Sequence, residues 1–254
     1  MEVLDLFSLK GKNALVTGSS QGLGAGMAIA LAQAGANVTL HGRGTVREST
    51  VQEVRKTGVQ YISVTGDVCE PAVCTNLVDE TVKAFGSIDI LVNNAGTIRR
   101  APAAEHSQEF WSTVIETNLN SVFRLSQYAG IRMLAQGSGK IVNIASMLTF
   151  QGGILVPSYA AAKGAVGQLT KALANEWAAK GVNVNAIAPG YMETANTAPL
   201  QADEERSKAI VSRIPAGRWG LPSDLAGAVV FLASAASNYV HGHILVVDGG
   251  WLCR

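Results

Sequence analysis

A tyrosine and a lysine, Tyr159 and Lys163, stand four residues apart in the segment Ser158-Tyr-Ala-Ala-Ala-Lys. On a helix this spacing places both side chains on one face. Carbonyl reduction needs a hydride on carbon and a proton on oxygen, and a phenol can supply the proton. Lowering the pKa of tyrosine from about 10 to near 7 requires about 4 kcal/mol. One ammonium about 4 Å away contributes on the order of 4 kcal/mol at an effective dielectric constant of about 20. Lys163 can therefore activate Tyr159, and no metal is required.

Two further polar residues accompany this pair. Ser146 closes the segment Asn143-Ile-Ala-Ser, just after a short apolar run, and Asn118 lies in the helical pattern that precedes that run. Each residue alone is unremarkable, but the combination behind a glycine-rich loop is specific. The candidate catalytic set is therefore Asn118, Ser146, Tyr159 and Lys163.

The glycine-rich loop reads Thr17-Gly-Ser-Ser-Gln-Gly-Leu-Gly24 and opens an alanine-rich helical segment. Its glycines permit a tight turn and let the backbone approach a pyrophosphate, whose charge then faces the helix N-terminus. Such a turn also occurs without a ligand. Its place at the first strand–helix junction of a long α/β chain favours a dinucleotide-binding loop.

The second strand indicates which dinucleotide binds. An NAD site usually has an acidic residue about 20 residues after the loop, at the end of that strand. Here the strand ends Leu40-His-Gly-Arg43, and no acid occurs from Ala36 to Arg47. An arginine can accept a 2′-phosphate and stack on adenine, so the pattern favours NADP(H). The alternative is that Arg43 is a solvated loop residue.

The elements that must position these residues alternate along the chain, short apolar runs with longer amphipathic ones. This order predicts one α/β domain, a Rossmann-like doubly wound fold with a parallel sheet of about seven strands and helices on both faces. The strands should be apolar on both sides. Strands are expected at 13–17, 37–41, 61–65, 88–92, 140–144, 183–187 and 244–247, and helices near 23–35, 46–57, 71–86, 107–136, 158–180, 202–213 and 222–236.

The least regular stretch covers residues 190–216. Ligands of open parallel sheets bind outside the carboxyl ends of the strands, so this insertion is placed to act as a lid. A solvated helical hairpin would explain it equally well.

Composition excludes several classes of protein. The 254 residues include 20 Lys and Arg against 19 Asp and Glu, a net charge of +1, which argues against a nucleic-acid-binding surface. Hydrophobic residues make up 48% and charged residues only 15%, which supports a packed core and association with further copies. No apolar run reaches the ~18–20 residues of a membrane span. The N-terminal segment has no signal-peptide pattern, so a cytoplasmic location is expected. The three cysteines and the pair His241 and His243 lack metal-ligand spacing, so no metal is expected.

The order of these motifs, completed by Pro189-Gly190, resembles the short-chain dehydrogenase/reductase family over nearly the whole chain. The resemblance implies that Tyr159 is the general acid/base, that Ser146 orients the substrate oxygen and that Lys163 holds the nicotinamide ribose. It also implies that Asn118 holds a water that passes protons to Lys163. The NAD(P)-binding residues would be Gly18, Ser20, Gln21, Gly22, Leu23, Gly24, Arg43, Asp67, Val68, Asn94, Ala95, Gly96, Tyr159, Lys163, Pro189, Gly190, Met192 and Thr194.

Five longer segments resemble the sugar-acid dehydrogenases of that family, the 2-dehydro-3-deoxy-D-gluconate 5-dehydrogenases (also called 2-deoxy-D-gluconate 3-dehydrogenases) and the gluconate 5-dehydrogenases. This resemblance implies a role in carbohydrate metabolism, an NAD cofactor, in contrast to Arg43, and a homotetramer built through the last strand and the helix before it. The aromatic residues of the last segment look exposed. The segments are Gly96–Arg100, Ala145–Gly153, Ala188–Thr194, Ile214–Asp224 and Val247–Trp251.

Residue chemistry agrees with an anionic polyol as substrate. Arg99 and Arg100 could bind a carboxylate, and Gln151 and Tyr191 could bind hydroxyls; Ser146 and Tyr159 would face the reacting oxygen. Two alternatives stay open. A 3-oxoacyl-[acyl-carrier-protein] reductase would share every catalytic residue, and a dinucleotide-sensing binding module would be expected to lack the Tyr or the Lys.

Overall fold

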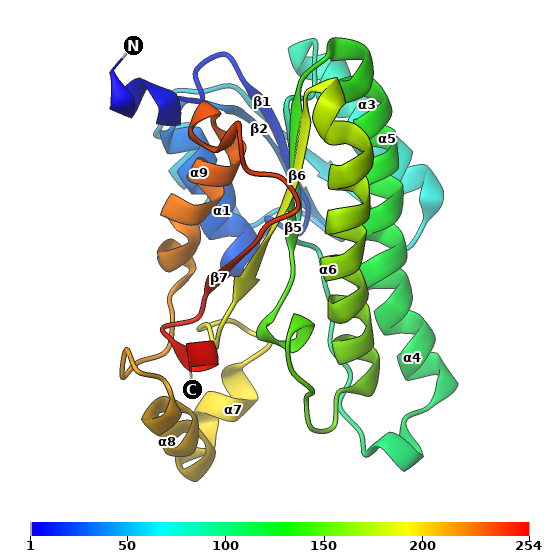
Figure 1. Cartoon of the computed structure of the whole chain (residues 1–254), viewed down its shortest axis with the longest axis vertical. Coiled ribbons are helices and arrows are strands. Elements are labelled where there is room, and N and C mark those ends of the chain that lie inside the picture. Colours follow the sequence, from blue (N-terminus) through cyan, green and yellow to red (C-terminus); the bar gives the residue numbers. More distant parts are fainter. Residues whose placement is uncertain (1, 254) are drawn as a thin grey trace.

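The computed structural model describes residues 2–253, which form a single seven-stranded parallel sheet covered by helices on both faces (Figure 1). The strand order is β3-β2-β1-β4-β5-β6-β7. The strands are β1 (Asn13–Val16), β2 (Asn37–Gly42), β3 (Tyr61–Thr65), β4 (Ile90–Asn93), β5 (Gly139–Ile144), β6 (Val182–Pro189) and β7 (Ile244–Val247). The helices are α1 (Gly22–Gln33), α2 (Glu48–Arg55), α3 (Pro71–Phe85), α4 (Gln108–Ile115), α5 (Ser121–Gln136), α6 (Pro157–Trp177), α7 (Ala198–Ala202), α8 (Glu204–Arg213) and α9 (Ala226–Ala233). The predicted fold class is confirmed.

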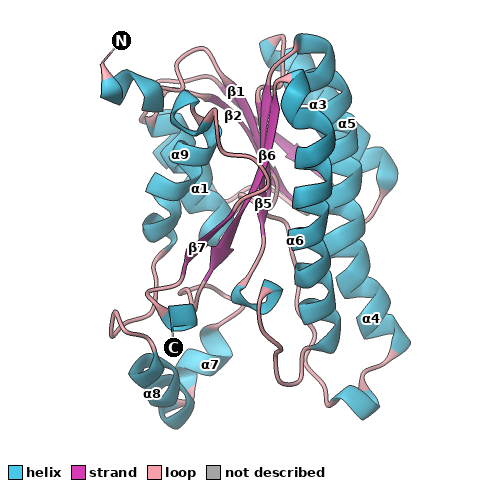
Figure 2. Ribbon diagram, viewed as in Figure 1, coloured by secondary structure: helices cyan, strands magenta, loops and turns pink. Residues whose placement is uncertain are grey.

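Two apolar layers hold the sheet between its helices. One core cluster joins the sheet to α1 and α9, and the other joins it to α3, α5 and α6, on the opposite sides that Figure 2 shows. All residues of β1, β4 and β6 are buried, as β-branched and apolar runs predict. The edge strands β3 and β7 are only partly buried. The expectation of strands covered on both faces is therefore wrong at the two edges, where the flanking layers end.

The strand order reverses at β1, which pairs with both β2 and β4. This switch point opens a crevice at the carboxyl ends of the strands, where ligands of such sheets bind. The insertion after β6 forms α7 and α8 beside this rim (Figure 1). The Asp203 side chain caps α8 by accepting a hydrogen bond from the Arg206 N–H at 2.9 Å.

One predicted helix is interrupted. The pattern at 107–136 forms α4 and α5, with a π-helical turn at Glu116–Asn120 between them. Such turns are often found at functional sites, and this one carries Asn118. Within residues 2–253, no helix is long and apolar enough to cross a membrane.

Candidate active site

The glycine-rich loop has the geometry that a phosphate site requires. Gly18 and Gly22 have φ values of +65° and +60°, which favour glycine. A Cβ on Gly24 would lie 2.3 Å from the carbonyl oxygen of Gly18. Gln21 precedes α1 without a capping side-chain bond, so the first N–H groups of that helix keep no side-chain partner there. The loop thus fits a pyrophosphate.

His41 holds the glycine-rich loop in place by hydrogen bonds. Its Nδ1 accepts a hydrogen bond from the Gly18 N–H at 3.0 Å, and its Nε2 bonds the Gly66 carbonyl oxygen at 3.0 Å. The backbone N–H of His41 donates to the Ser19 hydroxyl at 2.8 Å. Because one partner only donates and the other only accepts, the imidazole must be neutral with its proton on Nε2. Burial lowers its pKa. His41 therefore does not face a ligand, whereas its neighbour Arg43 is exposed.

Arg43 lies at the rim beside groups that a dinucleotide would meet. Its charge helps to lower the pKa of Asp67, an effect led by the hydrogen bond from the Cys69 N–H to that carboxylate. The segment after β2 is tied to the loop, because Ser20 accepts bonds from the Arg47 N–H and the Thr50 hydroxyl, each at 3.0 Å. The segment that carries the exposed Arg43 is thus tied to the phosphate loop.

Some of the remaining expected cofactor residues contact other parts of the protein, and the others line the pocket. Asn94 acts on the protein itself, because its Nδ2 donates to the carbonyl oxygens of Thr17 and Gly18. The Ala95 N–H donates to the Thr17 hydroxyl at 3.0 Å, and the Val68 side chain is buried in the core. Gly96 lies against Asn118. Leu23, Pro189, Gly190, Met192 and Thr194 line the pocket described below.

Asn118 is fully buried in the π-helical turn, and Thr97 occupies its amide. Asn118 Nδ2 donates to the Thr97 carbonyl oxygen at 2.7 Å, and Oδ1 accepts from the Thr97 N–H at 2.8 Å. Its side chain therefore positions the loop after β4. Thr97 takes one donor and one acceptor of this amide, and the expected water contact toward Lys163 stays a prediction.

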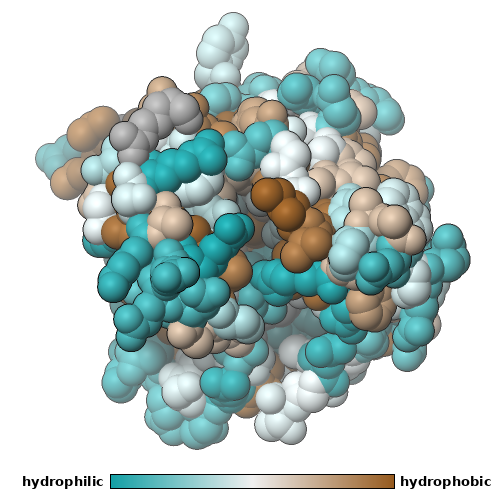
Figure 3. Space-filling view, turned by 90° about the horizontal axis from the view of Figure 1, so that it is seen from below, coloured by the Kyte–Doolittle hydropathy of each residue, from teal (hydrophilic) through white to brown (hydrophobic). Residues whose placement is uncertain are grey.

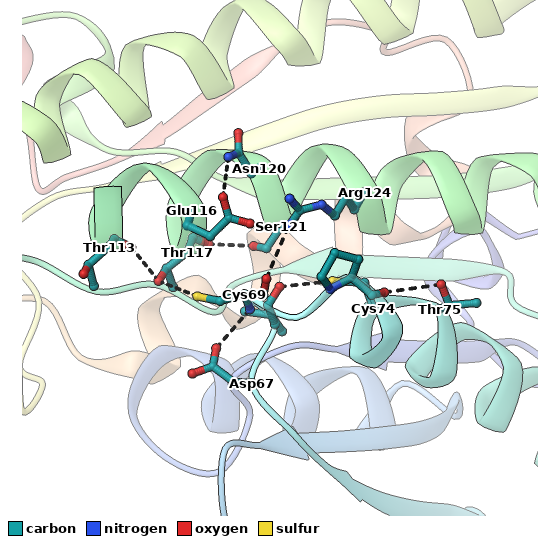
Figure 4. Close-up of polar contacts among 12 residues, drawn as sticks. Asp67, Cys69, Cys74, Thr75, Thr113, Glu116, Thr117, Asn120, Ser121 and Arg124 are labelled. Carbon is teal, nitrogen blue, oxygen red and sulfur yellow. Dashed lines mark hydrogen bonds and ion pairs between the residues drawn. The ribbon is translucent and has the colours of Figure 1, made fainter. Parts of the chain in front are cut away.

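Polar contacts beside the turn connect it to the strand end that carries Asp67 (Figure 4). Cys69 Sγ lies 3.2 Å from the Thr117 hydroxyl, one residue before Asn118. Glu116 pairs with Arg124 and accepts a bond from Asn120. These contacts bridge the rim at β3 to the turn that holds Asn118.

Tyr159 and Lys163 share one face of α6, with the Lys163 nitrogen 5.6 Å from the centroid of the Tyr159 ring. Lys163 donates to the Ile144 carbonyl oxygen at 2.5 Å, and burial lowers its pKa to about 8. Burial also raises the pKa of Tyr159, while Ser146 and the charge of Arg100 act in the opposite direction. The lowering of the Tyr159 pKa that was expected from Lys163 is not found in this structure.

A pocket of about 510 Å³ opens beside Tyr159 and Ser146 at the carboxyl rim. Seen from that end, hydrophobic surface near the centre adjoins hydrophilic surface around it (Figure 3). Gln151 and Tyr191 line the pocket as expected. Arg100 lines it too and donates to the Asn196 carbonyl oxygen at 3.2 Å.

Arg99 differs from this expectation. Its guanidinium donates to the Thr97 hydroxyl and the Ile98 carbonyl oxygen and lies over the Phe110 ring, and Arg99 is not among the residues that line the pocket. Successive residues of this loop face different ways, which the sequence alone does not reveal. The carboxylate clamp retains only Arg100 of the predicted pair.

Sequence reasoning missed several pocket residues, among them Arg206, Arg213 and Trp251. The two arginines lie seven residues apart, so they share one face of α8 with Ile210. That spacing was the available signal. Trp251, expected to be exposed, is only 5% exposed, because it packs in a small core cluster with Trp219 and Ile210.

Comparison with known proteins identifies relatives of this chain. A family model described as enoyl-(acyl carrier protein) reductase matches residues 18–252. The chain is 55% identical over 254 residues to 2-dehydro-3-deoxy-D-gluconate 5-dehydrogenase of Escherichia coli K12, covering 99% of this chain and 100% of the relative.

Two solved structures share the fold closely. A protein from Agrobacterium tumefaciens with bound NADP is 54% identical, with a TM-score of 0.93, over 98% of this chain and 100% of that one. A gluconate 5-dehydrogenase from Burkholderia cenocepacia, in complex with NADP and tartrate, is 40% identical, with a TM-score of 0.95, over the whole of both chains.

Proposed function

This chain belongs to the short-chain dehydrogenase/reductase family, and we propose that it transfers a hydride between NADP(H) and a secondary alcohol or ketone of a six-carbon sugar acid. It is an oxidoreductase of CH–OH groups that uses NAD(P). The sugar acid would be of the 2-dehydro-3-deoxygluconate, 2-deoxygluconate or gluconate type.

One observation carries the substrate class. The charged side chains that line the pocket beside Tyr159 are Arg100, Arg206 and Arg213, and no Asp, Glu or Lys of residues 2–253 joins them. A pocket whose fixed charges are all positive favours an anionic substrate over a neutral alcohol. Gln151, Asn196 and Thr197 add polar groups suited to hydroxyls.

The side chains supply the acid–base chemistry. A bound nicotinamide cofactor supplies or accepts the hydride. In the reducing direction, Tyr159 gives its phenolic proton to the substrate oxygen, which Ser146 holds by a hydrogen bond. Because burial raises the pKa of Tyr159, its phenol is protonated and ready to donate. Lys163, on the same face of α6, stabilises the phenolate that remains.

NADP is the proposed cofactor because the exposed Arg43 lies where an acid would stand in an NAD site. The Agrobacterium and Burkholderia proteins, which carry NADP in their structures, support this preference.

The proposed assembly is a homotetramer, for which exposed apolar side chains supply contact surface. Phe123 and Ile131 on α5 are 44% and 59% exposed, and Val246 on β7 is 37% exposed. A scattering mass of one chain would contradict this assembly.

The substrate is tested by initial rates with 2-dehydro-3-deoxygluconate, gluconate and a short acetoacetyl thioester, each with NAD and NADP. We expect turnover of a sugar acid, faster with NADP. The thioester belongs in the set because Phe150 and Ile154, 53% and 80% exposed, make apolar surface near the pocket. Thioester turnover alone would indicate an acyl-carrier-protein ketone reductase. Cofactor binding without any turnover would indicate a dinucleotide-sensing module.

A further inference from the structure

Two buried tryptophans pack against Tyr191, which lines the pocket, and they differ in one respect. Their rings lie edge-on to Tyr191, with centroid distances of 5.5 Å for Trp219 and 4.7 Å for Trp251. Trp219 donates its indole N–H to the Ser207 hydroxyl at 3.2 Å. The indole N–H of Trp251 is buried and has no partner. A buried donor without an acceptor costs about 1–3 kcal/mol, so an acceptor brought by a ligand that fits against Trp251 would remove this cost.

A guanidinium lies over the same indole ring. The Cζ of Arg213 lies 4.0 Å from the centroid of the Trp251 ring, a cation–π distance that restrains the guanidinium plane. Both residues line the pocket. Arg206 lines the same wall two turns earlier on α8, and no side-chain contact of it is found within residues 2–253. One wall therefore carries an indole donor and two guanidinium groups.

The chemistry of these donors selects their ligand. An indole and a guanidinium only donate hydrogen bonds, so together they suit a group that only accepts. An ionised carboxylate is such a group, whereas a hydroxyl would bring a proton of its own. Since no Asp or Glu of the described chain lines the pocket, a hydroxyl proton would find no charged acceptor there.

We propose that Trp251 and Arg213 form the anchor for the carboxylate of the substrate, with the indole N–H bonding one oxygen and the guanidinium supplying the charge. The inference rests on the proposed function and names the residues that read the acid. It assigns selectivity to α8 and the segment after β7, whereas the charge of Arg100 acts on Tyr159. The anchor would hold one end of the sugar acid while Ser146 and Tyr159 meet the reacting carbon.

The first test compares Trp251→Phe with Trp219→Phe as the matched control. Both changes remove an indole N–H from the same aromatic cluster, but only Trp251 has its N–H free for substrate. A hydrogen bond to a charged group is worth about 1.5–3 kcal/mol, or roughly a 10- to 100-fold change in affinity. We expect KM for the sugar acid to rise about tenfold or more in Trp251→Phe, with the KM for NADP unchanged. Trp219→Phe should change the sugar-acid KM much less. Equal changes in both variants would overturn the anchor.

The second test measures binding without turnover and separates the two hypotheses. Gluconate is titrated calorimetrically into the NADP-bound protein, wild type and Trp251→Phe, alongside an uncharged alditol of the same length. The anchor predicts that wild type favours gluconate and that the variant loses this preference. A wild type that binds gluconate but turns over no sugar acid would contradict the proposed function alone. An unchanged preference in the variant would contradict the anchor alone. If Trp251→Phe melts early, Arg213→Met and Arg213→Lys replace it, and only the lysine, which keeps the charge, should retain part of the preference.

Discussion

The two halves of the carboxyl rim treat their polar groups in opposite ways. In the cofactor half, the side chains of His41 and Asn94 hold the backbone of the glycine-rich loop by hydrogen bonds. In the substrate half, the Trp251 indole N–H is buried without a partner, and the charged residues of 2–253 that line the pocket are all arginines. A satisfied polar network is rigid and specifies one conformation. The cofactor half therefore has its loop ordered before a ligand binds, whereas the proposed anchor would leave the substrate half to be completed by its ligand.

The largest effect is expected for Tyr159→Phe, where the two halves meet. This change removes the hydroxyl of the proposed general acid. General acid–base catalysis contributes about 10²–10⁴-fold, so we expect kcat to fall by at least about 10³-fold. NADP binding should stay nearly intact, because the loop does not depend on this residue. Steady-state rates and quenching of protein fluorescence by NADPH measure the two effects. Retained turnover would remove Tyr159 from its role.

Gly24→Ala tests the rigidity of the cofactor half. The added Cβ would lie 2.3 Å from the Gly18 carbonyl oxygen and 2.4 Å from Asn94 Nδ2, so backbone must move. Because the loop is held on several sides, we expect a loss of NADP affinity of about tenfold or more. Gly164→Ala on α6, whose Cβ would meet nothing within 4 Å, is the control. It should slightly raise the melting temperature, since Ala favours helix over Gly by up to about 1 kcal/mol. A Gly24→Ala protein with unchanged affinity would show the loop to be pliable.

Arg43→Ala tests the selectivity of the same half. Loss of a charge-assisted contact of about 1.5–3 kcal/mol should lower kcat/KM with NADP roughly 10- to 100-fold. The value with NAD should hardly change. Arg47→Ala is the matched control, because its contact with Ser20 is made by the backbone N–H and survives the substitution. A wild-type preference for NAD above about tenfold would show that Arg43 points elsewhere.

The contrast between the halves also explains what the sequence could predict. The seven strands, the phosphate loop and the Tyr159–Lys163 pair depend on local periodicity and on residues close together in the chain. The observed ends of these elements differ from the predicted ones by a few residues. The π-helical turn at Glu116–Asn120 was not predicted, because it lies inside the continuous helical pattern at 107–136. The cofactor half could be predicted from the sequence because its phosphate loop is one continuous motif.

The substrate wall combines residues far apart in the chain, and local patterns cannot bring them together. Arg213 and Trp251 meet only because α8 and the end of the chain pack on one another. Trp251 was expected to be exposed for this reason. Arg99 and Arg100 have the same chemistry, and only the course of the loop decides that Arg100 alone faces the pocket.

The smallest expected effect concerns His41, the side chain on which the rigid half depends. Because burial holds its pKa below the ordinary value of 6.5, the neutral form stabilises the fold above that value. This stability is lost as the pH falls through the folded-state pKa. Protonation would place an N–H on Nδ1 against the Gly18 N–H and release the loop. The other charged groups nearby are Asp67, which favours the protonated form, and Arg43, which faces Asp67.

We therefore expect cofactor affinity to weaken a few-fold between pH 7 and pH 5. NAD is the better probe, because the 2′-phosphate of NADP itself titrates in this range. His41→Asn retains an acceptor for the Gly18 N–H but cannot take up a proton, so its affinity should be lower throughout and flat with pH. Fluorescence titrations at half-unit pH steps give both curves. A wild-type curve as flat as that of the variant would mean that Gly18 does not depend on His41, and the rigidity of the cofactor half would then rest on Asn94.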